Sequence, residues 1–174
     1  MSAASRTSRP AQTVAGPMLP WLSTLARLVL GGVWLVAGWM KITDLDASVR
    51  AVRAYRLLPE TLAQVVGAGL PAVEVLLGVL LVVGAGVRAG AVVSAVLMAA
   101  FVVGIASAWL RGLQIDCGCF GSGGALTVGE DPDYGWELAR DGGLFLLAVL
   151  LVRWPRGPFA LDSLLGSQRK GEHL

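Results

Sequence analysis

Apolar residues along the chain gather in four long runs that polar segments separate. A helix needs about 20 mostly apolar residues to cross a hydrocarbon layer roughly 30 Å thick. Four runs meet this requirement, at residues 21–40, 62–83, 88–110 and 137–154. The pattern therefore predicts an all-α integral membrane protein, a bundle of four transmembrane helices. The fourth run has the weakest pattern, because Arg140 and Asp141 enter its first turns.

The segments outside these runs predict two tails around one membrane domain. Residues 1–18 are mostly small and polar and are expected to form a disordered cytoplasmic tail. The four-helix domain is expected over 19–156, and a polar C-terminal tail over 157–174. The first apolar run is longer than the roughly 7 to 15 residues of a signal-peptide core and ends in Trp and Lys rather than a small-residue cleavage site, so we expect it to be retained.

The linker between the first two runs, DLDASVRAVRAYRLLPE, has a helical pattern of its own. Asp44 is suited to an N-cap. Apolar residues and arginines then fall on different helix faces, Leu45, Val49 and Val52 on one and Arg50, Arg53 and Arg56 on the other. This pattern predicts a short interfacial amphipathic helix on the membrane surface. The alternative is a polar loop whose arginines contact lipid headgroups.

Basic residues near the helix ends predict the orientation, because basic loops tend to stay cytoplasmic. The side that holds both termini has seven of them, Arg6, Arg9, Arg88, Arg153, Arg156, Arg169 and Lys170. The opposite side has five, Lys41, Arg50, Arg53, Arg56 and Arg111. The count favours cytoplasmic termini in a cell membrane protein, with the cysteine-containing loop on the outer side.

Composition agrees with a membrane protein and excludes one class of partner. Only 15% of the 174 residues are charged, the mean hydropathy is +0.69, and the net charge is +2. The basic residues are dispersed rather than gathered on one face, so the electrostatic pattern of a nucleic-acid-binding protein is missing.

The chain has two cysteines, Cys117 and Cys119, in the segment IDCGCFGSGG. A disulfide between them is feasible, but so small a loop gains little stability from it. Gly118 permits the unusual dihedrals of a tight ring, and strained, exposed disulfides are the labile or catalytic kind. Arg111, if near, would favour a thiolate, whereas the C-terminal end of the third helix would disfavour it.

Other interpretations of the cysteine pair stay open at this point. They are a permanent small bridge, inert thiols and a metal site. A closed zinc site needs four ligands, and the one histidine, His173, lies in a tail predicted on the opposite side, so no metal is predicted.

Charged residues within the runs suggest two further features. Glu74 and Arg27 are expected at similar depths, and we predict that they form a structural pair; alternatively Arg27 reaches the headgroups while Glu74 stays protonated. Lys41, Arg140 and Asp141 are expected near the level of the cysteines. They are candidates for a polar cavity that positions a quinone headgroup, and simple interfacial placement is the alternative.

Several motifs together resemble a known family. GGVWLVAGWMKITD closes the first run, YRLLPE precedes the second, LPAVEVLLGVLLVVG lies within it, DCGCFG follows the third, and RDGGL opens the fourth. In this order they resemble the MauE (methylamine utilisation) family of the DoxX-like membrane proteins, over about residues 20 to 154. The resemblance implies four spans and redox or disulfide chemistry. It also implies a role like that suggested for MauE in maturing the disulfide-rich methylamine dehydrogenase, while DoxX-like proteins are also linked to quinone-coupled oxidation.

From this we predict a membrane thiol-disulfide redox component. Cys117 and Cys119 would alternate between dithiol and disulfide and exchange electrons with a separate thioredoxin-like or disulfide-containing protein, with quinone as a candidate acceptor. The sequence does not decide which cysteine attacks, nor whether the chain is an enzyme. The alternatives are an assembly or maturation subunit whose cysteine pair is structural, and a small transporter organised around Glu74.

Overall fold

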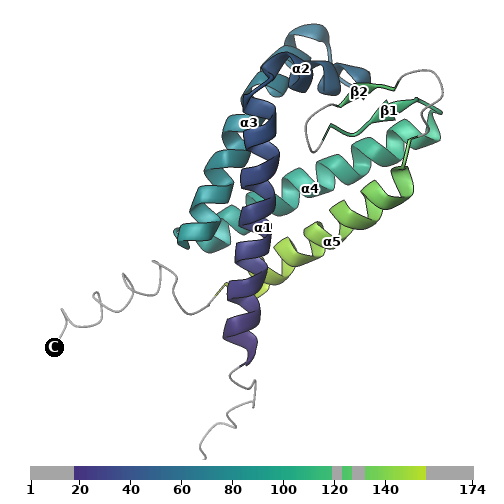
Figure 1. Cartoon of the computed structure of the whole chain (residues 1–174). Coiled ribbons are helices and arrows are strands. Elements are labelled where there is room, and N and C mark those ends of the chain that lie inside the picture. Colours follow the sequence, from purple (N-terminus) through teal and green to yellow (C-terminus); the bar gives the residue numbers. More distant parts are fainter. Residues whose placement is uncertain (1–17, 119–122, 127–131, 156–174) are drawn as a thin grey trace, which may run out of the picture.

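The protein is described here from a computed structural model, for residues 18–118, 123–126 and 132–155. In these residues five α-helices and one two-stranded hairpin follow each other along the chain (Figure 1). The helices are α1 (Met18–Ile42), α2 (Leu45–Ala54), α3 (Glu60–Val83), α4 (Val87–Leu110) and α5 (Tyr134–Arg153), and the strands are β1 (Ile115–Asp116) and β2 (Gly124–Ala125). The predicted N-terminal tail, except for its last residue, and the predicted C-terminal tail lie outside the described residues.

Three of the described helices are long and apolar enough to cross a membrane, over Pro20–Ile42, Glu60–Val83 and Val87–Leu110. These segments correspond to the first three predicted spans. The fourth predicted span does form a helix, α5, but this helix is not among the three candidates. Its first eight residues include Glu137, Arg140 and Asp141, which lower its mean hydropathy.

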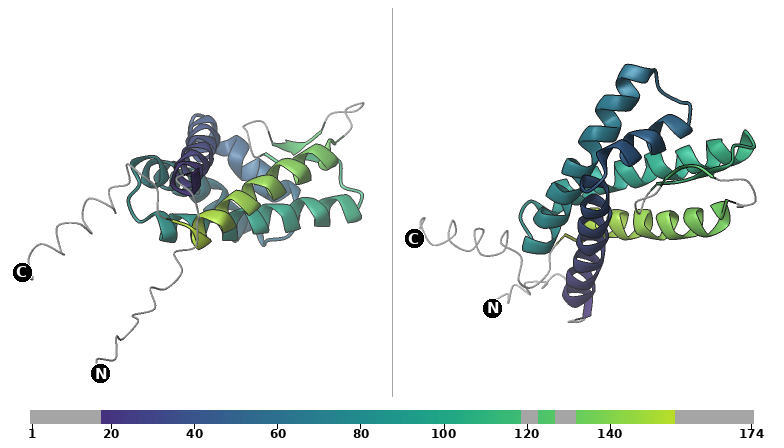
Figure 2. Two further views of the ribbon diagram at one scale, coloured as in Figure 1. Left: turned by 90° about the horizontal axis from the view of Figure 1, so that it is seen from below. Right: turned by 45° about the horizontal axis from the view of Figure 1, so that its top comes forward.

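The long helices pack as two pairs, α1 with α3 and α4 with α5, and the pairs cross at a wide angle (Figures 1 and 2). Glycines bring α1 and α3 close together, because a Cβ at Gly38 would lie 2.9 Å from the Pro71 carbonyl oxygen. Gly31 and Gly78 meet in the same way further along the two helices. Gly32 of the same helix α1 has open space around it.

Buried aromatic and aliphatic side chains connect the two pairs. Trp34 of α1 is 1% exposed, and its indole N–H donates a hydrogen bond to the Ser94 hydroxyl of α4 at 2.9 Å. Its ring lies 6.3 Å from that of Phe101. At the other end of the molecule, the Ser23 hydroxyl donates to the Trp154 carbonyl at 2.8 Å. The beginning of α1 and the end of α5 therefore lie side by side.

The linker between α1 and α3 contains the predicted short helix, α2, and the Asp44 carboxylate caps it by accepting the Ala47 N–H at 2.8 Å. The apolar side chains expected to face the surface are only partly buried or exposed. The buried face consists of small residues instead, Ala47, Ser48 and Ala51. Ser48 donates a hydrogen bond to the Gly67 carbonyl at 2.7 Å, so α2 is fixed across the first turns of α3. This arrangement holds α2 over the end of the bundle where the β-hairpin lies.

Candidate functional site

The hairpin that follows α4 positions Cys117. Strand β1 pairs antiparallel with β2, with Ile115 opposite Ala125 and Asp116 opposite Gly124. Gly118 has a φ of +67°, the left-handed conformation expected for a tight ring. A Cβ at Gly123 would lie 2.0 Å from the Gly118 Cα, so the backbones on the two sides of the loop touch. Cys119 lies outside the described residues, so the predicted pair is represented here by Cys117 alone.

The only two tyrosines of the chain hold this hairpin in place. The Tyr134 hydroxyl, at the start of α5, donates to the Leu113 carbonyl and accepts the Ile115 N–H at 3.3 Å. The Tyr55 hydroxyl, at the end of α2, donates to the Cys117 carbonyl at 3.1 Å. Neither tyrosine was predicted from the sequence to belong to the site. The chain has only these two tyrosines, one on each side of the cysteines, and this placement is the sequence feature that could have indicated their role.

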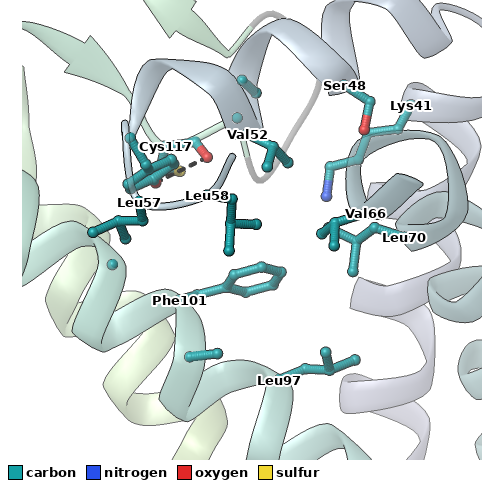
Figure 3. A pocket seen from close by; sticks show the side chains of 15 residues that line it. Lys41, Ser48, Val52, Leu57, Leu58, Val66, Leu70, Leu97, Phe101 and Cys117 are labelled. Carbon is teal, nitrogen blue, oxygen red and sulfur yellow. Dashed lines mark hydrogen bonds between the residues drawn. The ribbon is translucent and has the colours of Figure 1, made fainter. Parts of the chain in front are cut away.

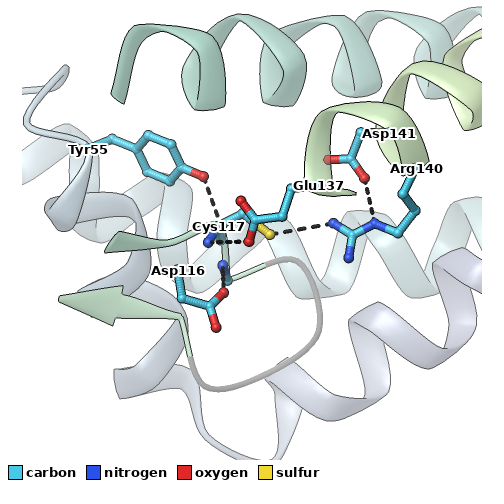
Figure 4. A network of polar contacts seen from close by, with 7 residues as sticks. Tyr55, Asp116, Cys117, Glu137, Arg140 and Asp141 are labelled. Carbon is cyan, nitrogen blue, oxygen red and sulfur yellow. Dashed lines mark hydrogen bonds and ion pairs between the residues drawn. The ribbon is translucent and has the colours of Figure 1, made fainter. Parts of the chain in front are cut away.

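The Cys117 sulfur lies among charged side chains of α5 (Figure 4). An Arg140 guanidinium nitrogen (Nη2) is 3.5 Å from it, and the Nε of the same guanidinium donates to an Asp141 oxygen at 2.9 Å. The Cys117 backbone N–H donates to Glu137 Oε1 at 3.2 Å. Arg111, considered as a partner for the thiol, instead bonds the Ser107 and Tyr55 carbonyls. The cation at the sulfur is therefore Arg140, at the N-terminal rather than the C-terminal end of a helix.

Carboxylates also lie near the Cys117 sulfur, and their negative charge offsets the positive charge of Arg140. Ligand oxygens of Asp116 and Glu137 and the Cys117 sulfur all lie within 4.8 Å of one another, a spacing that could hold a metal ion. Asp116 already accepts the Gly118 N–H at 2.9 Å, and the Arg140 guanidinium beside the sulfur would repel a metal cation.

Glu137 is half-buried in the first turn of α5, outside the three candidate spans. Burial raises the pKa of its carboxyl group above the ordinary value, and this outweighs the hydrogen bond from the Cys117 backbone, which lowers it. Its second oxygen, Oε2, is buried and has no hydrogen-bond partner. This carboxyl group can therefore take up a proton beside the thiol at a higher pH than an exposed one.

An apolar cavity of about 270 Å³ lies between α1, α2, α3 and α4 (Figure 3). Its walls include Cys117 and Lys41, which lie on opposite sides in Figure 3, together with Phe101 and Val66. The Lys41 ammonium is buried, forms an ion pair with Glu74 at 2.5 Å, and lies 5.8 Å from the centre of the Phe101 ring. A small apolar molecule in this cavity would contact the cysteine and one charged hydrogen-bond donor.

The predicted pairing of Arg27 with Glu74 is wrong, because Glu74 pairs with Lys41. The prediction assumed that α1 and α3 end at the same level. In the structure Gly38 lies opposite Pro71 and Val75, which places Glu74 near Gly38. Arg27 is eleven residues from Gly38, which is roughly 16 Å along the helix axis, and Lys41 is less than one turn from it.

The three residues proposed for one polar cavity are divided between two places. Lys41 lines the apolar cavity. Arg140 and Asp141 lie together on α5 beside the Cys117 sulfur. Cys117 belongs to both places, since it lines the cavity and contacts Arg140.

Comparison with known proteins identifies the family. The model of the family "Methylamine utilisation protein MauE" matches residues 19–153, from the first residues of α1 to the end of α5. The chain belongs to the MauE family. A relative, the methylamine utilization protein MauE of Paracoccus denitrificans, is 36% identical over 108 residues, which are 62% of this chain and 56% of the relative. This MauE-family chain thus matches a little over half of that relative's length. No solved structure matches it.

Proposed function

We propose that this MauE-family protein is a membrane thiol-disulfide redox component in which Cys117 and Cys119 alternate between dithiol and disulfide. Its partner is a separate thioredoxin-like or disulfide-containing protein. The observation that supports this best is the surroundings of Cys117: a guanidinium at 3.5 Å from the sulfur and a carboxyl group with a raised pKa that bonds the same residue. A nearby guanidinium favours the thiolate form of a cysteine. A nearby carboxyl group can accept the proton that the thiol loses.

The proposed topology has four membrane passes, with α5 as the fourth. The adjacent ends of α1 and α5 support an even number of passes, because both ends then lie on one side. The charge-free part of α5, residues 142–152, is short, and its charged first turns lie level with the hairpin. We propose that the termini are cytoplasmic and that α2 lies at the outer surface, with its exposed Leu45 toward lipid.

We also propose that a quinone accepts the electrons, in the apolar cavity. Lys41 supports this proposal because its ammonium lines a cavity that Cys117 also lines, and an ammonium has three N–H donors, of which Glu74 takes one. The pair with Glu74 is neutral overall, which suits an uncharged carbonyl group.

A substitution on one face of α4 tests the quinone site. Ala100 lines the cavity, whereas its neighbour Ala99 lies in a shallow depression between α4 and α5. We expect A100F to weaken binding of a decyl-substituted benzoquinone at least tenfold by calorimetry, and A99F to leave it unchanged. Equal affinities in the two variants would exclude the cavity as the quinone site.

Replacement of the cysteines tests the redox function itself. We expect the double variant C117A/C119A to fold with a nearly unchanged thermal midpoint, because a bridge across so short a loop stabilises little. It should nevertheless lose all ability to oxidise or reduce a purified thioredoxin-like protein, followed by mass spectrometry of the thiols. Turnover that persists without the cysteines would refute the proposal.

The other candidate is a non-catalytic assembly subunit. It is favoured by the hydrogen bonds at both backbone groups of Cys117, from its N–H to Glu137 and to its carbonyl from Tyr55, which suit a structural loop. In that case C117A/C119A should retain the protein's function, because alanine keeps both of these backbone hydrogen bonds, and the thiol state of the wild type should not change when a partner is added. The two proposals therefore predict opposite results for the same variant.

A further inference from the structure

We propose that the apolar cavity opens sideways into the lipid bilayer, between α3 and α4, and binds the uncharged head of a membrane amphiphile whose hydrocarbon tail extends through this opening. This inference rests on the proposed quinone site and deepens it, since a quinone with a hydrocarbon tail is one such molecule. The ligand therefore enters from the membrane rather than from water.

The opening follows from the way α3 and α4 diverge. The two helices are joined by a short turn at residues 84–86, near which a Cβ at Gly90 would lie 3.3 Å from the Leu81 side chain. From this turn they separate at a wide angle (Figures 1 and 2). The cavity lies in the wedge between them, because Val66 of α3 and Leu97 of α4 both line it (Figure 3).

The lining of the cavity changes from buried and polar to exposed and apolar. Lys41 and Ser48 are 4% and 3% exposed and form the buried end. Leu57, Leu58 and Val66 line the same cavity but are 54%, 42% and 41% exposed, so they form its mouth. Exposed apolar side chains grouped around a cavity mark a membrane or ligand contact. The mouth is therefore suited to hydrocarbon rather than to water.

The mouth lies at the depth of the membrane-spanning segments. Val66 is six residues from Glu60, the first residue of α3, which is roughly 9 Å along the helix axis. Ala100, an exposed residue of the cavity wall, is ten residues from Leu110 at the end of α4, which is roughly 15 Å. Both helices are long and apolar enough to cross a membrane. An opening at this depth faces lipid tails, because the hydrocarbon layer is roughly 30 Å thick.

The side of the cavity toward α2 is covered. A Cβ at Gly118 would lie 2.6 Å from the Ala51 Cβ, so the hairpin touches α2. The Arg111 guanidinium donates to the Tyr55 carbonyl at 2.5 Å, which ties the end of α4 to the end of α2. The Tyr55 hydroxyl in turn donates to the Cys117 carbonyl. Within the described part of the chain, a ligand from the water phase would have to pass through this cover.

The buried end of the cavity favours an uncharged head. The Lys41 ammonium already has an anionic partner in Glu74, with which an anionic headgroup would have to compete. An ammonium has three N–H donors, and those that Glu74 does not take suit a carbonyl oxygen. The volume of about 270 Å³ is below the roughly 300–1,000 Å³ of pockets that enclose a drug-sized ligand. A ring with small substituents fits this volume, and a long tail has to extend through the mouth.

A photoreactive amphiphile tests the orientation of the ligand. The probe is a benzoquinone with a ten-carbon tail that has a diazirine on its third carbon, photolysed with the full chain in phosphatidylcholine nanodiscs. We expect peptide mass spectrometry to find the label on Leu57, Leu58 and Val66, and excess decyl-substituted benzoquinone to abolish it. Labelling that this competitor does not reduce would overturn the proposal. Displacement of the probe by excess phosphatidic acid would overturn the uncharged head.

A substitution at the mouth tests the route of entry. V66F narrows the mouth, whereas V65F places the same side chain at a neighbouring residue that is 65% exposed and does not line the cavity. We expect V66F to slow both association and dissociation of decyl-substituted benzoquinone about fivefold, followed by quenching of tryptophan fluorescence. V65F should keep the wild-type rates. Equal rates in the two variants would overturn entry between α3 and α4.

The outcomes separate this inference from the proposed function. If A100F weakens quinone binding but V66F and V65F have equal rates, the route of entry fails and the proposed quinone site stands. If the probe labels the mouth and V66F slows binding, but redox turnover persists in C117A/C119A, the thiol-disulfide function fails. The sideways opening and its amphiphile ligand then stand without it.

Discussion

Two polar sites lie on opposite sides of the same apolar cavity, and they differ in how completely their charges are paired (Figures 3 and 4). At the first, Lys41 and Glu74 form a buried ion pair between α1 and α3. At the second, one guanidinium contacts the Cys117 sulfur while two carboxylates lie within 4.8 Å of it. The first site is a neutral pair of helix residues. The second joins a hairpin to a helix, and its charged groups are not paired one to one.

The two sites therefore differ in what a single substitution removes. A buried ion pair is strongly destabilised when one partner is removed, because the other charge remains in an apolar surrounding. The Cys117 sulfur contacts a guanidinium directly, so a change in its charged neighbours acts on the thiol itself. We therefore expect substitutions at the first site to change stability and substitutions at the second to change thiol reactivity.

The largest expected effect is at the ion pair. K41M leaves the Glu74 carboxylate buried without its cation and should destabilise the protein by about 3–5 kcal/mol. The double variant K41M/E74L removes both charges and should recover much of this loss, as thermal or denaturant unfolding in detergent would show. The pairing in the structure would be refuted if E74L alone and K41M alone were both harmless.

The next effect concerns the contact between α1 and α3 that places this pair. G38A inserts a methyl group 2.9 Å from the Pro71 carbonyl oxygen and should cost about 1–3 kcal/mol. G32A, on the open side of the same helix, should be neutral or stabilising by up to about 1 kcal/mol. Similar unfolding midpoints for the two variants would contradict the close packing of these helices.

At the cysteine site, removal of one hydrogen bond should affect the reactivity of the thiol more than the stability of the helix bundle. Y55F removes the hydrogen bond to the Cys117 carbonyl and should cost only about 0.5–1.5 kcal/mol. We expect its unfolding midpoint to stay near that of the wild type while the alkylation rate of Cys117, measured in a C119S background, changes severalfold. A large stability loss without a change in this rate would place Tyr55 in the structural site instead.

The smallest expected effect is the pH dependence of Glu137, which is half-buried. Its pKa is raised in the folded protein, so the folded state prefers the protonated form. The stability that this provides is present below the ordinary carboxyl pKa and is lost as the pH rises through the raised one. E137Q should remove this part of the pH dependence. An unchanged stability profile between the ordinary pKa and neutral pH would contradict the assignment.

The positions of the spans could be predicted from the sequence because each depends on local composition. Runs of apolar residues indicate the helices at 20–42, 60–83 and 87–110, and Asp44 indicates the start of α2. The charges in the first turns of α5 were visible too, and they are the reason that its place in the membrane is still a proposal.

The pairing of side chains could not be predicted, because it depends on how the helices are offset along their axes. Counting residues from the helix ends placed Glu74 beside Arg27. Glycine contacts between α1 and α3 set a different offset, which places Glu74 beside Lys41. In the same way, Arg111 is six residues from Cys117 in sequence, yet Arg140, 23 residues away, contacts the sulfur. The hairpin and its two tyrosines bring α5 to the cysteine, and no periodic pattern shows that contact.

The oxidation state of the cysteine pair in native membranes tests the central claim most directly. Membranes are treated with a maleimide of known mass before and after reduction, and the modified chain is weighed by mass spectrometry. The redox proposal predicts a mixture in which some molecules gain two labels only after reduction, and a shift of that mixture when a thioredoxin-like partner is added in its oxidised or reduced form. A pair that carries two labels in every condition, whichever form of the partner is present, would contradict it.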